Sequence, residues 1–535
     1  MTLFTPTWRY RLVISYFNNL DYIMTQTSDN NKRIAKNTLF LYFRSLIIMA
    51  ISIFTSRIVL QTLGISDYGI YNVVGGFVGM FSILSSSLVN ASQRFISYEM
   101  GKQVPQLSRV FCGTVSVHLI LVVALLILFE SVGLWFLNTH LNISPDRIVA
   151  ANWVYQCSVL TFCVNLISVP YNATIIAHEK MSAFAYIGIY EVLAKLGIVY
   201  LLWLTDKDKL IIYAILLVIV SLSLRFIYGY YCKKQFEECN FKFKFDKIFI
   251  KSLLGFTGWN FIGSVAGILV TQGVNVLINL FFGVALNAAR GIAEQVNNAI
   301  NQFITNFMTA MNPQITKSCA AKDYEYMNKL MIRGAKYSTL LFVFLSLPIF
   351  MEADFILGLW LVEVPPYAPL FLRLAIIYST FQSLSNTLYI GMLATGRIKN
   401  YQIMMGSIYI MSFILCFIFF KIGLGPEWGY ISTILALFVG MFVRLYLLRS
   451  MISGFSIFSF IKGAIFKVII VIFFALLIIC TLNHLLTCNE ILKSIIIMAL
   501  ALLLVPVFTY TFSLSESEKA MLKKQCVLIK AKVFS

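Results

Sequence analysis

The sequence predicts an all-α, polytopic membrane protein with about fourteen transmembrane helices, and three observations support this prediction. Hydrophobic residues make up 59% of the 535 residues and charged residues only 12%, about half the charged share of an ordinary soluble chain. Apolar runs recur along almost the whole length, and each is long enough to cross ~30 Å of hydrocarbon as a helix. Alternating strand patterns are absent, so helices must satisfy the backbone polar groups inside the lipid.

The predicted spans fill the chain between two polar ends. A faint internal repeat, in which Leu63-Gly64 and Phe282-Gly283 open similar strings, favours two lobes of six helices in the same orientation, followed by two extra helices. In chain order the spans are 38–60, 69–90, 110–137, 149–169, 182–203, 210–231, 253–282, 284–311, 337–351, 368–393, 402–420, 428–449, 464–486 and 492–512.

These spans define the expected domain organisation. Met24 opens a polar, basic lead-in and is a candidate for the true start, in which case residues 1–23 lie upstream of it. The expected parts are a cytoplasmic N-terminal tail (1–37), a first six-helix lobe (38–231), a cytoplasmic linker (232–252), a second six-helix lobe (253–449), two additional helices (450–512) and a basic cytoplasmic tail (513–535).

The distribution of lysine and arginine predicts the orientation. With the N-terminus inside, inner segments carry most of the 42 basic residues, which is the positive-inside pattern and places both termini in the cytoplasm. Because the net charge of +19 is spread over short loops, it does not indicate a nucleic-acid partner. The outer loops carry only Arg147, Lys207, Lys209, Lys421 and Lys493.

Enzymatic function is disfavoured by what the sequence lacks. No loop is long enough for a folded domain that could hold catalytic groups, and neither a phosphate-binding loop nor a Cys/His ligand spacing occurs. We therefore expect no catalytic residue, no metal site and no cofactor.

Ionisable side chains inside the spans are the first candidates for function, because each costs roughly 2.5–3.5 kcal/mol at the bilayer centre. Arg44 and Arg57 lie on the first span, where they either reach the headgroups or line a wet cavity. Glu191 and Lys195 are four residues apart on the fifth span, either as a self-neutralised pair or as a charged cavity site.

A polar stripe marks the seventh and eighth spans. On the eighth, polar residues recur at three- and four-residue steps on one helix face, as interhelical glue or as a cavity lining. Because this stripe includes a charge of each sign, we favour the cavity, with Glu191 and Glu294 as candidates for ion coupling. The stripe comprises Asn287, Arg290, Glu294, Asn297 with Asn298, Asn301 and Thr305, and the seventh span echoes it with Gln272, Asn275 and Asn279.

Several local strings between residues 32 and 450 carry a family resemblance. In them the chain resembles the polysaccharide-biosynthesis flippases of the Wzx type, in the superfamily that also holds MATE multidrug exporters and lipid II flippases. The strings include Leu63-Gly64-Ile65-Ser66-Asp67-Tyr68-Gly69, Gln93-Arg94-Phe95-Ile96, Ala177-His178-Glu179-Lys180-Met181, Gly258-Trp259-Asn260 and Asn287-Ala288-Ala289-Arg290-Gly291.

The resemblance implies two six-helix lobes around a central cavity that opens alternately to each side of the membrane and binds an anionic lipid through cationic residues. It points to Arg44, Arg57 and Arg290 as such residues, while Lys195 is added from its buried charge alone. Arginine offers a fixed fork of donors suited to phosphate oxygens.

The expected function is therefore that of a flippase. It would translocate polyprenyl-diphosphate-linked oligosaccharide to the outer leaflet of a bacterial inner membrane for O-antigen or capsule biosynthesis. Its expected partners are that lipid, other membrane lipids, and the polysaccharide polymerase and chain-length regulator of the same pathway. Two alternatives stay open: a MATE-like drug/cation antiporter, and a membrane glycosyltransferase or polymerase.

Overall fold

The structure is a computed structural model, and it describes residues 7–79, 81–140, 144–205, 207–240, 246–361, 364–486, 489–516 and 518–520. The side chains of residues before Arg33 and of some later helix residues, including Arg57, lie outside the description. All regular structure in the described ranges is helical, so the all-α, polytopic membrane fold predicted from the sequence is confirmed.

The first bundle begins with one very long helix. α1 (Thr7–Gly79) has 73 residues and is broken at Gly64, whose φ of 79° and ψ of 168° only glycine adopts without strain. The two arms of α1 therefore belong to different spans. The other helices of this bundle are α2 (Ser82–Met100), α3 (Leu107–Leu128), α4 (Leu134–His140), α5 (Ile148–Ala177), α6 (Met181–Leu201) and α7 (Lys209–Gln235).

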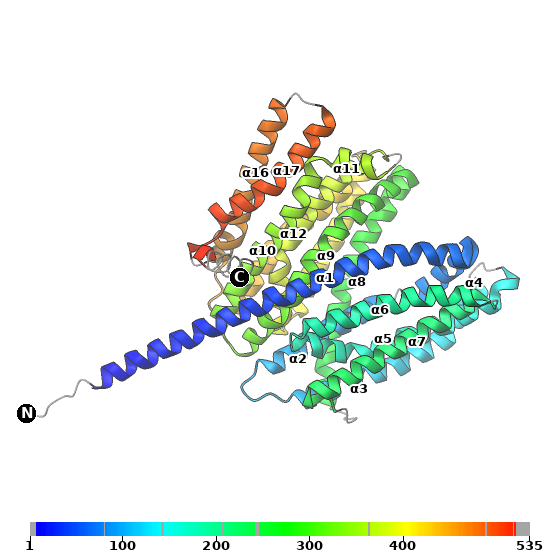
Figure 1. Cartoon of the computed structure of the whole chain (residues 1–535), viewed down its shortest axis with the longest axis horizontal. Coiled ribbons are helices and arrows are strands. Elements are labelled where there is room, and N and C mark those ends of the chain that lie inside the picture. The colour runs from blue at the N-terminus through cyan, green and yellow to red at the C-terminus, as the bar shows by residue number, and fades with distance from the viewer. Residues whose placement is uncertain are drawn as a thin grey trace, which may run out of the picture.

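The second bundle lies beside the first, as Figure 1 shows in green and yellow. Gly283 joins α8 to α9 with φ 86° and ψ 179°, nearly the conformation of Gly64, so the two glycines of the sequence repeat make the same backbone turn. Its helices are α8 (Lys247–Phe282), α9 (Val284–Ala320), α10 (Tyr324–Met351), α11 (Ala353–Trp360), α12 (Ala368–Thr395), α13 (Lys399–Lys421) and α14 (Trp428–Met451).

Two further helices, α16 (Phe466–Leu485) and α17 (Glu490–Phe508), form a hairpin that packs on α10 (Figure 1). Their shared core includes Val468, Val471 and Ala475 of α16 with Ile497 and Ala501 of α17, and the rings of Phe474 and Phe508 lie 6.0 Å apart beside it. A short helix, α15 (Ile457–Phe460), leads into this hairpin from α14.

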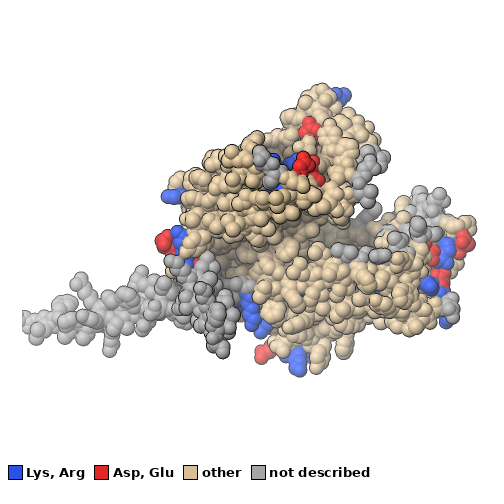
Figure 2. All heavy atoms as spheres, turned by 45° about the horizontal axis from the view of Figure 1, so that its top comes forward, with Lys and Arg blue, Asp and Glu red and all other residues tan. Residues whose placement is uncertain are grey.

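Among the described residues, 11 helical segments are long and apolar enough to cross a membrane. α9 and α12 are not among them, although they have 37 and 28 residues and pack extensively against each other. Both carry the polar side chains that an internal helix of a transport protein can keep away from lipid. Many of the charged side chains visible in Figure 2 lie toward the two ends of the bundles, and a further cluster of both signs lies near the middle of the upper part of the view.

The ninth predicted span differs from the structure. The sequence suggested a short span at 337–351, whereas α10 begins at Tyr324. Lys336 interrupts the apolar run, but its Nζ lies 2.9 Å from the Glu518 carboxylate and 3.2 Å from the Ser513 carbonyl oxygen. The helix is continuous because the chain after α17 supplies the counter-charge, which a local hydropathy pattern does not reveal.

Candidate transport cleft

The two bundles touch each other at one end of the molecule, which we call the terminal face. It carries the start of α1 and the loops at 101–106, 178–180 and 396–398, and both chain ends lie toward it in Figure 1. On the α1 side, the rings of Tyr42 and Phe303 lie 5.5 Å apart, and Asn306 Nδ2 donates to Ser45 Oγ at 2.6 Å. These contacts join α1 directly to α9.

A buried carboxylate ties three elements together at the terminal face. Glu179, in the turn between α5 and α6, accepts from Arg33 Nε of α1 at 2.7 Å and from Lys317 Nζ of α9 at 2.7 Å. Gln314 of α9 donates to both carboxylate oxygens, at 2.9 and 3.0 Å. The side chain is 1% exposed and its backbone is left-handed, with φ 58°, so the local structure must hold it in place.

A second set of contacts closes the same end through α2. Arg94 donates to the Ala394 carbonyl oxygen at 3.3 Å, and its guanidinium lies 5.6 Å from the centre of the Phe256 ring. Phe95 packs edge-on against Phe249 at 5.5 Å. The hydrogen bond between Asn306 and Ser45 is the polar contact between the bundles that lies farthest from the terminal face among the described residues. Figure 2 shows a hollow in the surface between the bundles.

A row of amide side chains on α9 continues from this contact toward the opposite face. Gln302 lies one turn from Asn306, with Nε2 3.5 Å from its Oδ1, and Asn298 and Gln295 follow at helical steps. Gln302, Asn298 and Gln295 are all exposed. Since a spanning helix does not turn amides toward lipid, this face lines a wet space that opens where α9 leaves α1.

The facing surface of α1 is only moderately polar. Ser45 begins it at the contact with α9, and Met49 and Ser52 follow on the same side of the helix, both exposed. A cleft with amides on one wall and small or flexible side chains on the other suits a polar cargo that has no fixed shape.

The predicted stripe on α9 faces mainly into its own bundle. Asn301 Nδ2 donates to Ser379 Oγ of α12 at 2.9 Å and to the Asn297 carbonyl oxygen at 3.0 Å. Asn297 itself is buried, and its Oδ1 has no hydrogen-bond partner among the described residues. Asn301 therefore binds α9 to α12 in this structure, and a role of either residue in substrate binding stays a prediction.

Arg290 and Glu294 lie together near α14. Arg290 is 6% exposed, donates through Nη2 to the Thr271 carbonyl oxygen at 3.3 Å, and its guanidinium lies 5.1 Å from the centre of the Tyr430 ring. The Tyr430 hydroxyl donates to Glu294 Oε1 at 2.8 Å. Nη1 of Arg290 is buried without a hydrogen-bond partner in the described part of the chain, and a role of Arg290 in substrate binding stays a prediction.

The two predicted residues on α8 lie beside Thr271, the backbone partner of Arg290. Gln272 is exposed, whereas Asn275 is partly buried and its Oδ1 has no hydrogen-bond partner within the described ranges. The α8 and α9 predictions thus gather in the second bundle.

The remaining predicted residues belong to the first bundle, along the contact of α1 with α6. The Arg44 guanidinium lies 4.4 Å from the centre of the Phe184 ring and packs against Gly188, and its Nε is buried and bonds to no described residue. Lys195 Nζ is 2.6 Å from Glu191 Oε1, with the side chains 45% and 36% exposed. Arg57 lies on the same arm of α1, but its side chain is outside the described residues.

Sequence reasoning missed the residues that join the bundles and two of the amides that continue the row. Glu179 and Arg94 stood in the strings that carry the family resemblance, but nothing local indicated a contact with Lys317 or Ala394. Gln295 and Gln302 have the helical spacing of a stripe. The sequence could not identify them as exposed, because the position of α1 decides which polar face of α9 is exposed.

Comparisons with known proteins agree with this architecture. The sequence profile of the family described as "Polysaccharide biosynthesis protein" matches residues 34–319, more than half of the chain. No curated protein matches the chain.

Solved structures similar to this one are transporters. An outward-facing multidrug resistance MATE transporter of the MOP superfamily has 13% identity and a TM-score of 0.66, covering 79% of this chain and 97% of its own. A point mutant of the Vibrio cholerae MATE transporter VcmN has 15% identity and a TM-score of 0.66, covering 80% of this chain and 98% of its own.

A third similar structure is a MOP superfamily transporter from Pyrococcus furiosus, described as having a binding pocket of reverse polarity. It has 13% identity and a TM-score of 0.61, and covers 79% of this chain and 96% of its own. At these identities the likeness concerns the fold alone. Together with the matching profile, it shows that the chain belongs to the polysaccharide biosynthesis protein family and has the fold of the MATE transporters.

Proposed function

We propose that the protein is a flippase that carries a polyprenyl-diphosphate-linked oligosaccharide from the cytoplasmic to the outer leaflet of a bacterial inner membrane. The observation that carries this proposal is the exposed amide row of Gln295, Asn298 and Gln302, which continues outward from the contact between the bundles. Amides both donate and accept hydrogen bonds, so they can replace the water around sugar hydroxyls. The family match supports a role in making surface polysaccharide, such as O-antigen or capsule.

The cargo carries a diphosphate as well as sugars, and cationic groups near the cleft can bind this diphosphate. Arg290 offers a buried donor that no described residue occupies in the second bundle, and Arg44 and Lys195 lie in the first bundle. Hydrogen bonds to charged groups are roughly twice as strong as neutral ones, so one or two such contacts suffice to hold a phosphate. The polyprenyl chain stays in the lipid between the bundles.

The contacts at the terminal face define the state of the transport cycle. Basic residues in its loops, among them Lys102, Lys180 and Arg397, support its assignment to the cytoplasm by the positive-inside rule. The described conformation is then closed to the cytoplasm and open to the outside.

The membrane potential can drive the transport. With a negative cell interior, outward movement of the diphosphate gains about 2.3 kcal/mol per charge per 100 mV. Proton or ion exchange at Glu191 or Glu294 is the alternative driving force.

A drug/cation antiporter is the second candidate, because the similar structures are multidrug transporters. Such a cleft must attract cations, whereas here Arg290, Arg44 and Lys195 outnumber Glu294 and Glu191. We expect overproduction of the protein to leave the resistance of cells to cationic drugs unchanged. Increased resistance together with normal surface polysaccharide in a deletion strain would favour the antiporter.

The direct test is transport in liposomes. Purified protein is reconstituted with the lipid-linked oligosaccharide extracted from its own cells, and the fraction reaching the other leaflet is followed over time. Replacing Asn298 and Gln302 together by leucine removes two amides, each worth about 0.5–1.5 kcal/mol, so the rate should fall roughly 5- to 150-fold. Thr481→Leu, at an exposed position of α16, is the control. An unchanged rate in the double variant contradicts the proposal.

A further inference from the structure

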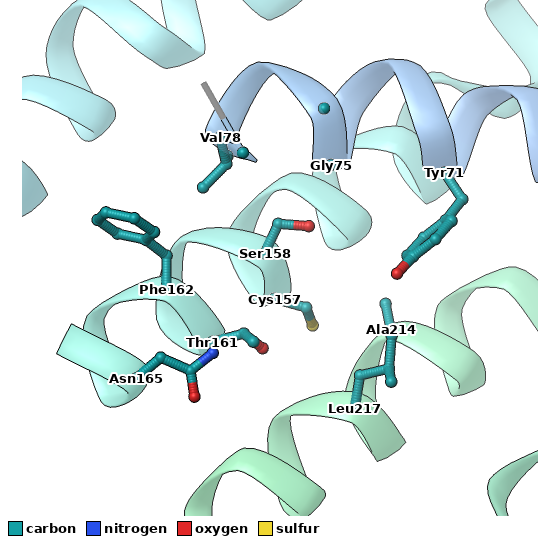
Figure 3. Close-up of a pocket in the computed structure, with 12 residues that line it drawn as sticks. Tyr71, Gly75, Val78, Cys157, Ser158, Thr161, Phe162, Asn165, Ala214 and Leu217 are labelled. Atoms are coloured by element: carbon teal, nitrogen blue, oxygen red, sulfur yellow. The ribbon is translucent and has the colours of Figure 1, made fainter. Parts of the chain in front are cut away.

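The first bundle contains a cavity of about 360 Å³ between the second arm of α1, α5 and α7 (Figure 3). None of the residues described above at the terminal face or along the amide row lines it. This volume lies within the usual range for small-molecule sites, about 300–1,000 Å³. The residues used below come from its lining: Tyr71 and Gly75 of α1, and Ser158, Thr161, Phe162 and Asn165 of α5.

The polar side chains of α5 in this cavity have no partner within the described part of the chain. Ser168, further along α5, donates to the Val164 carbonyl oxygen at 2.8 Å, the usual arrangement for a hydroxyl in a membrane helix. Ser158, Thr161 and Asn165 make no such bond to a described residue. Their donors and acceptors are therefore available, at three- and four-residue steps on one face of the helix.

Aromatic rings and bare backbone complete the lining. In Figure 3 the Tyr71 hydroxyl points into the cavity from α1, opposite Ser158, and Phe162 lies at the far end. At Gly75 the backbone borders the cavity directly, and an added Cβ would lie 3.8 Å from Ser158 Oγ. None of the described lining residues is charged.

We propose that this cavity binds one neutral sugar ring of the lipid-linked cargo, an inference that rests on the proposed flippase function and adds a subsite to it. Hydroxyl and amide groups match the equatorial hydroxyls of a pyranose, and the flat faces of Tyr71 and Phe162 match its C–H faces. The described lining holds no carboxylate that could pair with a cationic drug and no cationic side chain that could pair with a free phosphate.

Binding to the full-length protein in lipid nanodiscs tests the subsite. Two compounds are compared: the lipid-linked oligosaccharide extracted from the producing cells, and the same polyprenyl diphosphate without sugars. Unaltered protein should bind the first about tenfold more tightly. Ser158→Leu fills the cavity and should abolish that difference while leaving the affinity for the sugar-free lipid unchanged.

A more conservative substitution tests the subsite even if the Ser158→Leu protein misfolds. Thr161→Val keeps the shape but removes one hydroxyl, and should weaken only the sugar-bearing lipid, by roughly threefold. Thr481→Val on α16 is the matched control and should change neither affinity.

The outcomes separate the two proposals. If Ser158→Leu keeps the sugar-dependent difference, or weakens both lipids equally, the sugar subsite is wrong. If unaltered protein binds both lipids equally well, the subsite fails and the flippase proposal stands. Binding of neither lipid overturns both.

Discussion

Replacing Glu179 by glutamine should open the terminal face. The carboxylate is 1% exposed and holds Arg33 and Lys317, which lie on different bundles, at 2.7 Å each. Glutamine keeps the size and one acceptor oxygen but removes the charge, so Lys317, whose side chain is 19% exposed, loses its counter-ion.

The magnitude follows from the burial of each partner. Removing one member of a buried pair costs about 3–5 kcal/mol, whereas an exposed pair contributes about 0–1 kcal/mol. Arg33 is 49% exposed and belongs to the second kind. Because glutamine still accepts one bond from Lys317, we expect a net loss of about 2–3 kcal/mol from the closed state, which is roughly a 30- to 150-fold shift of the equilibrium.

The shift is measurable as a distance across the terminal face. Spin labels at Val104 of the first bundle and Asn400 of the second are both exposed, and a genetically encoded label avoids the ten native cysteines. In the Glu179→Gln variant a longer inter-label distance should become populated.

The control for this experiment is Glu325→Gln, which removes an exposed pair with Lys329 within α10. It should leave the distance distribution as in unaltered protein. If Glu179→Gln also leaves it unchanged, the carboxylate does not hold the bundles together and the reasoning is refuted.

Three further predictions concern single positions. Gly64→Ala places a side chain at φ 79°, ψ 168°, which costs about 1–3 kcal/mol, so the thermal unfolding temperature in detergent should fall; an unchanged value would mean that the break in α1 relaxes freely. Although burial opposes its ionisation, hydrogen bonds from the Ser515 amide, Tyr337 and Lys336 lower the pKa of Glu518 from 4.5 to about 2. The stabilisation is thus present above pH ~4.5 and lost as the pH falls toward 2, and Glu518→Gln should remove this acid dependence from a series of unfolding curves. Arg290→Ala should reduce transport by roughly 10- to 150-fold, since a charged hydrogen bond is worth about 1.5–3 kcal/mol, while Arg290→Lys should keep part of the activity; normal transport by a membrane-inserted Arg290→Ala protein would remove the anchor role.

The sequence was sufficient for the features that depend on local pattern. Apolar runs predicted a polytopic helical protein, and the repeated Leu63-Gly64 and Phe282-Gly283 strings corresponded to two glycines with the same unusual backbone. Where a span was misjudged, the cause was distant in sequence. Lys336 interrupted an apolar run, and its partner Glu518 lies 182 residues away.

The candidate site shows where local pattern stops being informative. α9 is polar on two faces, and spacing alone cannot distinguish the face that binds α12 from the face that meets water. Asn301, on the predicted stripe, donates to Ser379 of α12, whereas Asn298 is exposed. The position of α1 makes this distinction, because α1 contacts α9 at Asn306 and Phe303, whereas the amides from Gln302 to Gln295 are exposed.

The same geometry explains why the amides and the buried charges can have different tasks. An exposed amide exchanges partners with little change in free energy, so a row of them lets a sugar chain slide without a deep minimum. A buried cation with a donor left over, such as Arg290, holds one anion firmly and should favour a single resting position. A carrier of a long, anionic glycolipid needs both properties, and tight binding along the whole row would slow release. Additional arginines in place of Gln295 or Gln302 should therefore strengthen binding and reduce turnover.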